Sequence, residues 1–320
     1  MYKFLDLIFG YKKIKLFYYL NGIGSEFKFR FASIFYKNYS YPKINLEKHQ
    51  DHVNARVNYY NDLKENTPLG DSSRKISDIS RKEDSSVYYF DTVKYLLYFN
   101  PNAKINTLFG DIDYTPNIPS ITKSRPIINN TNSVLLKLNR IRHFNFIKDY
   151  RKFSSKKNKL IGRGFVADSK HLRINFLEKN FNNPLCNVGQ INDFRDNEWK
   201  LDFVSIFEQL RYKFILCWEG NDVSTSLKYV MSSNSLAVST KPKYETWFME
   251  GTLIGGVHYV EIKDDFSDLD EKINYYSTHI EEAEKIIKNA NDYTKQFKNK
   301  KREDLISILV LEKYFKNTNQ

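Results

Sequence analysis

The sequence predicts an α/β protein built on a doubly wound parallel sheet. Between residues 159 and 262, short apolar segments alternate with segments of helical periodicity, which is the pattern of consecutive β-α-β units. Apolar residues make up 41% of the 320-residue chain, enough to bury a sizeable core, so the composition favours a folded protein over a disordered one. A chain of this length predicts one large domain or two medium ones.

The N-terminal segment is apolar and aromatic but interrupted by charge. Asp6, Lys12, Lys13 and Lys15 break its first twenty residues, which argues against a signal peptide or a membrane-spanning helix. Two interpretations stay open. The segment could rest on a membrane surface, or it could form the first strand and helix of the fold.

The next hundred residues predict few regular elements. Helical periodicity marks residues 47–63 and 87–99. Between them, the polar stretch 61–86 predicts a long surface loop. Residues 104–110 read as a short strand that leads into the turn-rich loop 110–119. The basic stretch 148–159 has no apolar periodicity, and we interpret it as the linker between two domains.

The remaining chain supplies the β-α-β pattern. The expected strands are 159–165, 184–188, 213–220, 235–240 and 256–262. The expected helices are 168–181, 198–212, 223–233 and those from residue 268 onward. In such sheets, ligands bind beyond the carboxyl ends of the strands. The last helix, 302–315, is strongly apolar on one side and is expected to pack back across the domain junction.

Charge and cysteine content restrict the partners and the compartment. The formal net charge of +12 favours a polyanionic partner: nucleic acid, anionic lipid, phosphorylated glycan or nucleotide diphosphate. Charge alone does not choose among these. Cys186 and Cys217 lie in apolar strand segments, which predicts two buried, inert thiols and no disulfide framework. The six histidines do not show the spacing of a zinc site.

Two strand ends could bind a phosphate. After the strand 213–218, Gly220 permits a tight turn, and Asp222 or Ser224 could cap a helix whose first N–H groups suit a phosphate. After the strand 159–163, Arg163 and Gly164 are followed by Arg173 in the next helix, and guanidinium groups match a diphosphate. An ordinary capped turn and ordinary surface arginines remain the simpler interpretations of both.

The loop 110–119 carries Asp111 and Asp113, and three interpretations compete for it. The Asp-x-Asp spacing could hold a divalent ion on a diphosphate. One aspartate could instead act as a general base toward an acceptor hydroxyl. Alternatively, Asp and Pro serve only to form turns here.

Longer stretches give a more specific signal. Residues 219–251 and 256–273, together with KSRPI at 123–127, residues 132–149 and LIGRG at 160–164, resemble glycosyltransferase family 90. Within that family the similarity is to the bacterial, LpsA-like branch of lipopolysaccharide core biosynthesis. It extends from about residue 105 to 315.

The resemblance implies a GT-B fold, in which two Rossmann-like domains face each other across a cleft. It also implies an inverting transfer from a UDP-sugar without a metal or other cofactor. We accordingly expect an acceptor-side domain at 1–150, a nucleotide-sugar domain at 151–300 and a helix at 301–320 that docks on the first domain.

The resemblance also implies roles for particular residues. The catalytic base is expected at Asp113. Donor-binding residues are expected at Arg163, Gly164, Arg173, Gly220, Asn221, Asp222, Val223, Ser224 and Lys228. Acceptor or sugar contacts are expected at Asp111, Tyr114, Arg125, His143 and Glu245. Ser226 stands where many eukaryotic members have an arginine, so other cations, among them Lys228, would have to neutralise the leaving diphosphate.

The expected partners are a nucleotide-sugar donor and a lipopolysaccharide or related glycan acceptor, with no nucleic acid. The expected location is cytoplasmic, with peripheral contact to the inner face of the cytoplasmic membrane. Two rivals remain. One is a metal-dependent transferase that uses Asp111 and Asp113. The other is a non-enzymatic nucleic-acid-binding protein that uses mixed aromatic and basic residues, as in 295–302.

Overall fold

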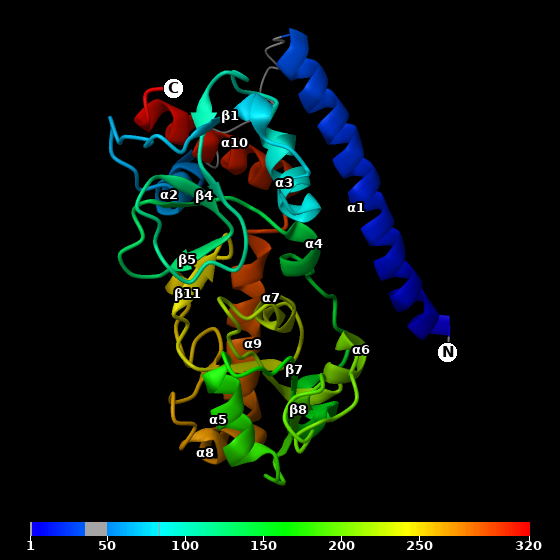
Figure 1. Cartoon of the computed structure of the whole chain (residues 1–320). Coiled ribbons are helices and arrows are strands. Elements are labelled where there is room, and N and C mark those ends of the chain that lie inside the picture. Colours follow the sequence, from blue (N-terminus) through cyan, green and yellow to red (C-terminus); the bar gives the residue numbers. More distant parts are fainter. Residues whose placement is uncertain (1, 36–49, 83) are drawn as a thin grey trace. The chain divides into compact units, whose positions relative to one another are not determined.

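The computed structural model describes residues 2–35, 50–82 and 84–320 (Figure 1). The chain forms two compact units. The first unit contains Met1–Arg142 and Asn299–Gln320, and the second contains His143–Lys298. Two parallel sheets, one in each unit, confirm the α/β class.

The first unit is mainly helical, with short strands. Its helices are α1 (Tyr2–Phe35), α2 (Gln50–Tyr60), η1 (Ile76–Asp78), α3 (Ser86–Leu96), α4 (Arg140–His143, which ends at the boundary) and α10 (Lys300–Asn317). Its strands are β1 (Arg74–Lys75), β2 (Lys104–Ile105), β3 (Thr107–Leu108), β4 (Ser120–Thr122), β5 (Ser124–Pro126) and β6 (Ser133–Leu135). Strands β3, β4 and β6 form a parallel sheet, and β1 pairs with β2 antiparallel.

The stretch 61–86 is not simply a surface loop. Leu63, Leu69, Ile76 and Ile79 are at most 8% exposed. The buried Asn61 amide donates to the Val310 carbonyl at 3.1 Å. Apolar side chains anchor this segment in the core of the first unit, which its polar composition concealed.

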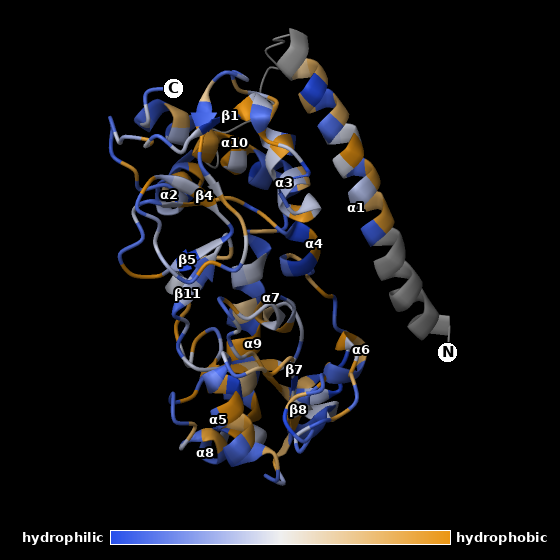
Figure 2. Cartoon of the chain, in the orientation of Figure 1, coloured by the Kyte–Doolittle hydropathy of each residue, from blue (hydrophilic) through white to orange (hydrophobic). Residues whose placement is uncertain are grey.

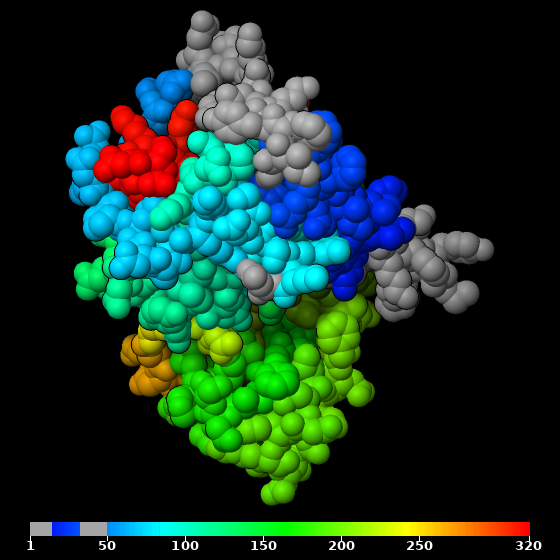
Figure 3. Space-filling model, turned by 45° about the horizontal axis from the view of Figure 1, so that its top comes forward, coloured from blue at the N-terminus to red at the C-terminus, as the bar shows by residue number. Residues whose placement is uncertain are grey.

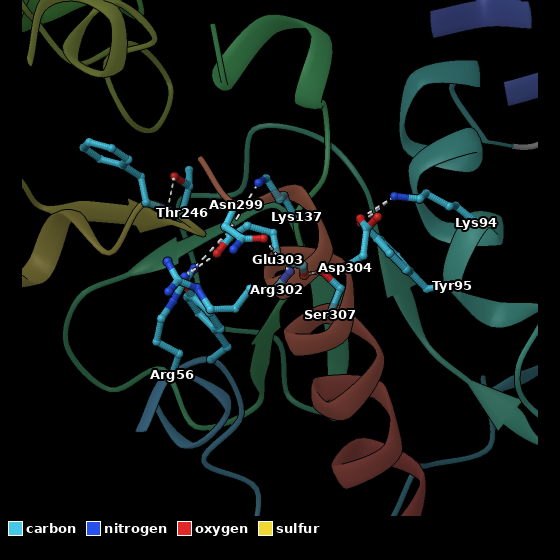
Figure 4. Close-up of polar contacts among 12 residues, drawn as sticks. Arg56, Lys94, Tyr95, Lys137, Thr246, Asn299, Arg302, Glu303, Asp304 and Ser307 are labelled. Carbon is cyan, nitrogen blue, oxygen red and sulfur yellow. Dashed lines mark hydrogen bonds and ion pairs between the residues drawn. The ribbon is translucent and has the colours of Figure 1, made fainter. Parts of the chain in front are cut away.

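A buried charge cluster fixes α10 within the first unit (Figure 4). The Glu303 carboxylate accepts hydrogen bonds from Arg56 of α2 and, at 3.1 Å, from Lys137. All three residues are at most 8% exposed. The next residue, Asp304, accepts hydrogen bonds from the ammonium group of Lys94 and from the hydroxyl of Tyr95, both in α3. Helix α10 is therefore held to α2 and α3 by ion pairs as well as by apolar packing.

The second unit contains a five-stranded parallel sheet. Its strands are β7 (Lys157–Gly164), β8 (Cys186–Gln190), β9 (Tyr212–Leu216), β10 (Leu236–Ser239) and β12 (Val260–Glu261), and β11 (Tyr244–Thr246) lies outside this sheet. Its helices are η2 (Phe153–Ser155), α5 (His171–Asn180), α6 (Ile206–Gln209), α7 (Ser226–Met231), η3 (Glu250–Thr252), α8 (Leu269–Thr278) and α9 (Ile280–Lys295). The strand order is β12-β10-β9-β7-β8, and α5, α7, α8 and α9 pack on the strands.

Two expectations for this unit were wrong. The stretch 148–159 is not a linker, because Asp149 and Lys156 form an ion pair that is buried with Phe153. The stretch 198–212 is not one helix, because its first part extends along the edge of the sheet. There, Gln190 N donates to Trp199 O, and Leu201 N donates to Gln190 O, each at 2.9 Å.

Both cysteines are buried, free thiols, as predicted. Burial raises the pKa of Cys186 and that of Cys217 to about 12. Because the thiolate is the reactive form, neither thiol is suited to act as a nucleophile at neutral pH.

Candidate functional site

The sheet of the second unit has a topological switch point between β7 and β9. After β7, the chain crosses through α5 to β8 at one edge of the sheet. It then returns to β9 on the other side of β7 and continues outward to β10 and β12. In open α/β sheets, ligands bind beyond the carboxyl ends of the two strands that flank such a point.

Glycine allows close packing where these two strands end. Gly164 ends β7, and a Cβ atom placed there would lie 2.9 Å from the indole ring of Trp218, which follows β9. Gly220 lies two residues further on, and a Cβ atom there would lie 3.1 Å from Nη2 of Arg173. The two Gly-containing motifs recognised in the sequence are therefore brought together.

Arg173 of α5 joins these strand ends. Its Nε donates to the Glu219 carbonyl at 3.2 Å, and its Nη1 donates to the Phe165 carbonyl at 2.7 Å. The guanidinium also lies over the Trp218 ring, 5.5 Å from the centroid. The switch point thus carries a positioned guanidinium group, a cation whose geometry suits a diphosphate.

Arg163, like Arg173, donates to backbone carbonyls. Its Nε donates to the Asp202 carbonyl, and its Nη1 donates to the carbonyls of Gly162 and Asn187. Its Nη2 donates to Asn187 Oδ1 at 2.8 Å. These bonds attach β7 to β8 and to the segment that follows β8.

The turn after β9 is tight but does not cap a helix as expected. Gly220 N donates to Asp222 O at 3.1 Å, Asn221 is exposed, and Asp222, Val223 and Ser224 are buried. Helix α7 begins at Ser226 with Thr225 as its N-cap residue, and no cap side chain accepts a hydrogen bond. The Ser224 hydroxyl instead lies 2.9 Å from that of Ser226. The proposed caps, Asp222 and Ser224, were therefore wrong.

Lys228 was also wrongly expected to face the diphosphate. Its side chain is 1% exposed and pairs with Glu250, which is equally buried. Glu250 in turn accepts from the backbone N–H of Thr246 at 2.7 Å and from its hydroxyl at 3.0 Å. The ion pair fixes α7 to the segment around η3, and its charge is balanced internally.

Glu219 is a candidate functional residue that the sequence reasoning missed. Its carboxylate accepts from the backbone N–H of Lys243 at 3.0 Å and is 8% exposed. Burial raises the pKa of Glu219 to about 7. Carboxyl groups with raised pKa values cluster at functional sites. The signal available in sequence was a glutamate directly after a fully apolar strand.

Glu219 should make stability depend on pH. Since its folded pKa lies above its ordinary value, folding binds a proton between about pH 4.5 and 7, and stability falls as the pH rises through this window. At about 1.4 kcal/mol per pKa unit, the loss amounts to about 3 kcal/mol. Urea unfolding at pH 4.5 and pH 7.5 should show this loss in the wild type and much less of it in Glu219→Gln. Equal losses in both proteins would contradict the assignment.

A cavity of about 710 Å³ lies at the same edge of the sheet. It opens beside the carboxyl ends of β10 and β12, and Lys241, Lys263 and Lys272 contribute three cations to its wall. Glu261 and Asp268 line it as well. The volume lies within the range of about 300–1,000 Å³ that is usual for ligand pockets.

The two aspartates of the loop 110–119 in the first unit have different surroundings. Ile112 is buried, and its backbone N–H and C=O each lie 3.2 Å from the Ser124 hydroxyl, which fixes the loop. Asp111 accepts a hydrogen bond from the ammonium group of Lys123, which is only 1% exposed. Asp113 is exposed. Both aspartates are therefore exposed, and Asp111 in addition balances a buried cation.

Among the expected acceptor contacts, Asp111 and Tyr114 are exposed, Tyr114 at 53%. His143 and Glu245 are at most 2% exposed. Arg125 is buried, and its guanidinium donates to the Tyr59 carbonyl at 2.8 Å and to the Ser133 carbonyl at 3.0 Å. The expectation for Arg125 was wrong, because its guanidinium binds α2 and β6 in the interior.

Within residues 2–35, 50–82 and 84–320, no three His, Cys, Asp or Glu side chains are grouped so that they could hold a metal ion. The same residues include no helix with an apolar stretch long enough to cross a bilayer.

Comparison with known families decides the kind of protein. The family model described as "Glycosyl transferase family 90" matches residues 128–317, more than half of the chain. The chain belongs to glycosyltransferase family 90. It is 43% identical, over 265 residues and 82% of both chains, to O-glucosyltransferase LpsA of Dichelobacter nodosus. This family 90 protein is therefore a glycosyltransferase, and the non-enzymatic nucleic-acid-binding alternative is rejected.

Other relatives of this family 90 chain match it over shorter stretches. Protein O-glucosyltransferase 3 of Homo sapiens is 29% identical over 154 residues, 46% of this chain and 30% of the human protein. Protein O-glucosyltransferase 2 of Danio rerio is 34% identical over 83 residues, 26% of this chain and 16% of the fish protein.

Solved structures similar to this family 90 chain are distant. An α1,3-fucosyltransferase with GDP-fucose has 14% identity and a TM-score of 0.40, covering 59% of this chain and 67% of its own. The C-terminal domain of the group 1 glycosyl transferase LpcC from Francisella tularensis has 12% identity and a TM-score of 0.33. The match covers 47% of this chain and 94% of the LpcC domain.

Proposed function

We propose that this family 90 enzyme transfers a hexose or pentose from a UDP-sugar to a lipopolysaccharide core or a related glycan. The proposal includes the family's GT-B fold, inversion at the anomeric carbon and activity without a metal. The observation that carries it is the 43% identity over 82% of both chains with O-glucosyltransferase LpsA. The acceptor-side role is assigned to residues 1–150 with helix 301–320, and the donor role to residues 151–300.

The donor diphosphate is proposed to bind at the switch point of the second unit. Gly164 and Gly220 allow Trp218 and Arg173 to pack closely at the strand ends, and Arg173 supplies the cation. The turn from Gly220 to Ser224 adds backbone N–H groups beside them. As the sugar leaves, negative charge grows on the diphosphate, and preorganised donors of this kind stabilise it. Lys228 is left out of this assignment because it is buried and paired with Glu250.

Replacing Arg173 with alanine should weaken the binding of UDP. A hydrogen bond to a charged group contributes about 1.5–3 kcal/mol, so affinity should fall about tenfold or more. Calorimetry with UDP measures this directly. Arg211→Ala is the matched control, because Arg211 is 49% exposed and pairs at the surface with Glu208. Equal affinities in folded Arg173→Ala and Arg211→Ala would place the donor elsewhere.

Asp113 is proposed as the general base. Its carboxylate takes the proton of an acceptor hydroxyl, and the hydroxyl oxygen attacks the anomeric carbon opposite the nucleotide. The bond from that carbon to the diphosphate breaks, and the electron pair leaves with UDP. The exposure of Asp113 leaves it accessible to an acceptor, whereas Asp111 already balances Lys123. Asp111 and Tyr114 remain candidate contacts to the sugar.

We expect transfer to survive chelation. In the rival Asp-x-Asp scheme both carboxylates bind a divalent ion, but Asp111 is already paired with a buried ammonium group. A second cation beside that ammonium would be repelled. Transfer assayed in EDTA should match transfer in manganese within about twofold, since a metal that took part in catalysis would change the rate by orders of magnitude. Abolition by EDTA with rescue by manganese would restore the rival scheme.

The proposed location is the cytoplasmic side of the inner membrane, as a peripheral protein. Lipopolysaccharide-type acceptors are anchored in lipid, so the enzyme meets them at a membrane surface. The net charge of +12 suits phosphorylated sugars and anionic headgroups.

A further inference from the structure

The described part of α1 carries two apolar faces, of which one is packed inside the first unit. The Tyr18 hydroxyl donates to the Val87 carbonyl of α3 at 3.0 Å. A Cβ atom at Gly22 would lie 2.6 Å from the ring of Phe90, so the two helices are in close contact. Phe29 is 1% exposed on the same face.

The opposite face of α1 is apolar but exposed. Figure 2 colours the hydrophobic residues of the described part of this helix orange. Six side chains of this face are between 43% and 74% exposed: Leu16, Phe17, Leu20, Ile23, Phe27 and Phe31. Apart from Phe17, they follow one another at intervals of three or four residues, so they form a single line along the helix. We call this set the α1 stripe. Figure 3 shows the described part of α1 (blue) at the surface of the molecule.

The size and shape of the α1 stripe argue against a second copy of the chain as its partner. From Leu16 to Phe31 the stripe is about 22 Å long at 1.5 Å per residue, on a helix about 10 Å wide. The stripe is therefore a narrow line of side chains, not the broad patch of about 20–30 residues that each partner contributes to a stable protein interface. A convex ridge of side chains also fits a fluid surface, which can close around it.

The charges beside the α1 stripe indicate the chemistry of that surface. Lys15 and Lys28 are exposed and adjoin stripe residues in the sequence. The whole chain carries a net charge of +12. Apolar side chains that enter the headgroup region and lysines that remain among the headgroups are the combination that binds anionic membranes.

We propose that the α1 stripe docks on an anionic membrane surface with α1 lying along the interface. The inference deepens the proposed function, because it rests on an acceptor that is carried by lipid, and it identifies the surface that reaches the membrane. In this arrangement the apolar side chains enter about 5–10 Å into the boundary between headgroups and acyl chains.

The test is co-sedimentation of the full chain with vesicles of phosphatidylcholine and phosphatidylglycerol at a ratio of about 3:1, without donor or acceptor. The variant Ile23→Ser/Phe27→Ser should bind at least about tenfold less than the wild type. The matched control is Phe203→Ser/Ile254→Ser. Phe203 and Phe27 are both 74% exposed, and Ile254 and Ile23 are 57% and 50% exposed. The control should bind like the wild type, and pure phosphatidylcholine should bind all three proteins more weakly.

Several results would overturn the inference: unchanged binding in the stripe variant, equal loss in both variants, or a stripe-dependent dimer in light scattering. Lys28→Glu keeps the test decisive if the serine variant fails to fold, because reversing an exposed charge should reduce binding to the anionic vesicles several-fold. Unchanged binding in Lys28→Glu would also count against it. Since no sugar is present, these outcomes are independent of whether the transfer reaction has been identified correctly.

Discussion

Asp113→Asn should lower the turnover of sugar transfer at least about a hundredfold, the lower end of general-base effects. Asparagine keeps the size of the side chain but cannot accept the acceptor proton. Because Asp113 is exposed, the variant should unfold at the same urea concentration as the wild type. Its affinity for UDP should stay within about threefold, a change of less than 1 kcal/mol. Single-turnover transfer and calorimetry on the same preparation measure both quantities.

Asp111→Asn is the internal comparison. It removes the charge that balances the buried Lys123, so its main effect should be on stability, by about 1–3 kcal/mol. Its turnover, measured at a temperature where it is folded, should stay within about tenfold of the wild type, since the base remains. Near wild-type turnover in Asp113→Asn would refute the base assignment, as would abolition of transfer by folded Asp111→Asn alone. Loss of UDP binding in both variants would indicate a shared metal.

Glu303→Ala should destabilise the first unit by about 3–5 kcal/mol, because it leaves the cations of Arg56 and Lys137 buried without their counter-ion. Burial already lowers the pKa of Lys137, because a charged ammonium group is less stable in the interior than in water. Urea unfolding followed by circular dichroism should show an early transition for the variant.

Glu65→Ala provides the matched control for this effect. Glu65 also pairs with a residue of α10, Lys316, but both side chains of that pair are 74% exposed and lie 3.8 Å apart. Exposed pairs contribute about 0–1 kcal/mol, so this variant should unfold close to the wild type. Similar losses of unfolding free energy in Glu303→Ala and Glu65→Ala would show that the stabilisation by the Glu303 cluster does not depend on its burial.

Much of the second unit could be predicted because its strands are continuous apolar runs. Most residues of 159–165 and 213–220 are buried, and the structure confirms strands there, β7 (Lys157–Gly164) and β9 (Tyr212–Leu216). The Glu303 cluster could not be predicted. Glu303 and Arg56 are 247 residues apart, and no local pattern signals their pairing.

The candidate site was predictable only in part, for a similar reason. Residues that follow parallel strands come together at one edge of the sheet, so Gly164 and Gly220 could be placed together from sequence. The partners of charged side chains could not be predicted. Arg163 and Lys228 looked like phosphate ligands, but the structure gives them backbone carbonyls and Glu250 as partners.

The most direct test of the proposed reaction is mass spectrometry of the lipopolysaccharide of a strain that lacks this gene. The proposal predicts a core shorter by one sugar. It also predicts that incubating this core with UDP-sugar and the purified wild-type chain in EDTA restores its mass, while the Asp113→Asn chain restores it at least about a hundredfold more slowly. A core of unchanged mass in the deletion strain, or equal restoration by wild type and Asp113→Asn, would contradict it.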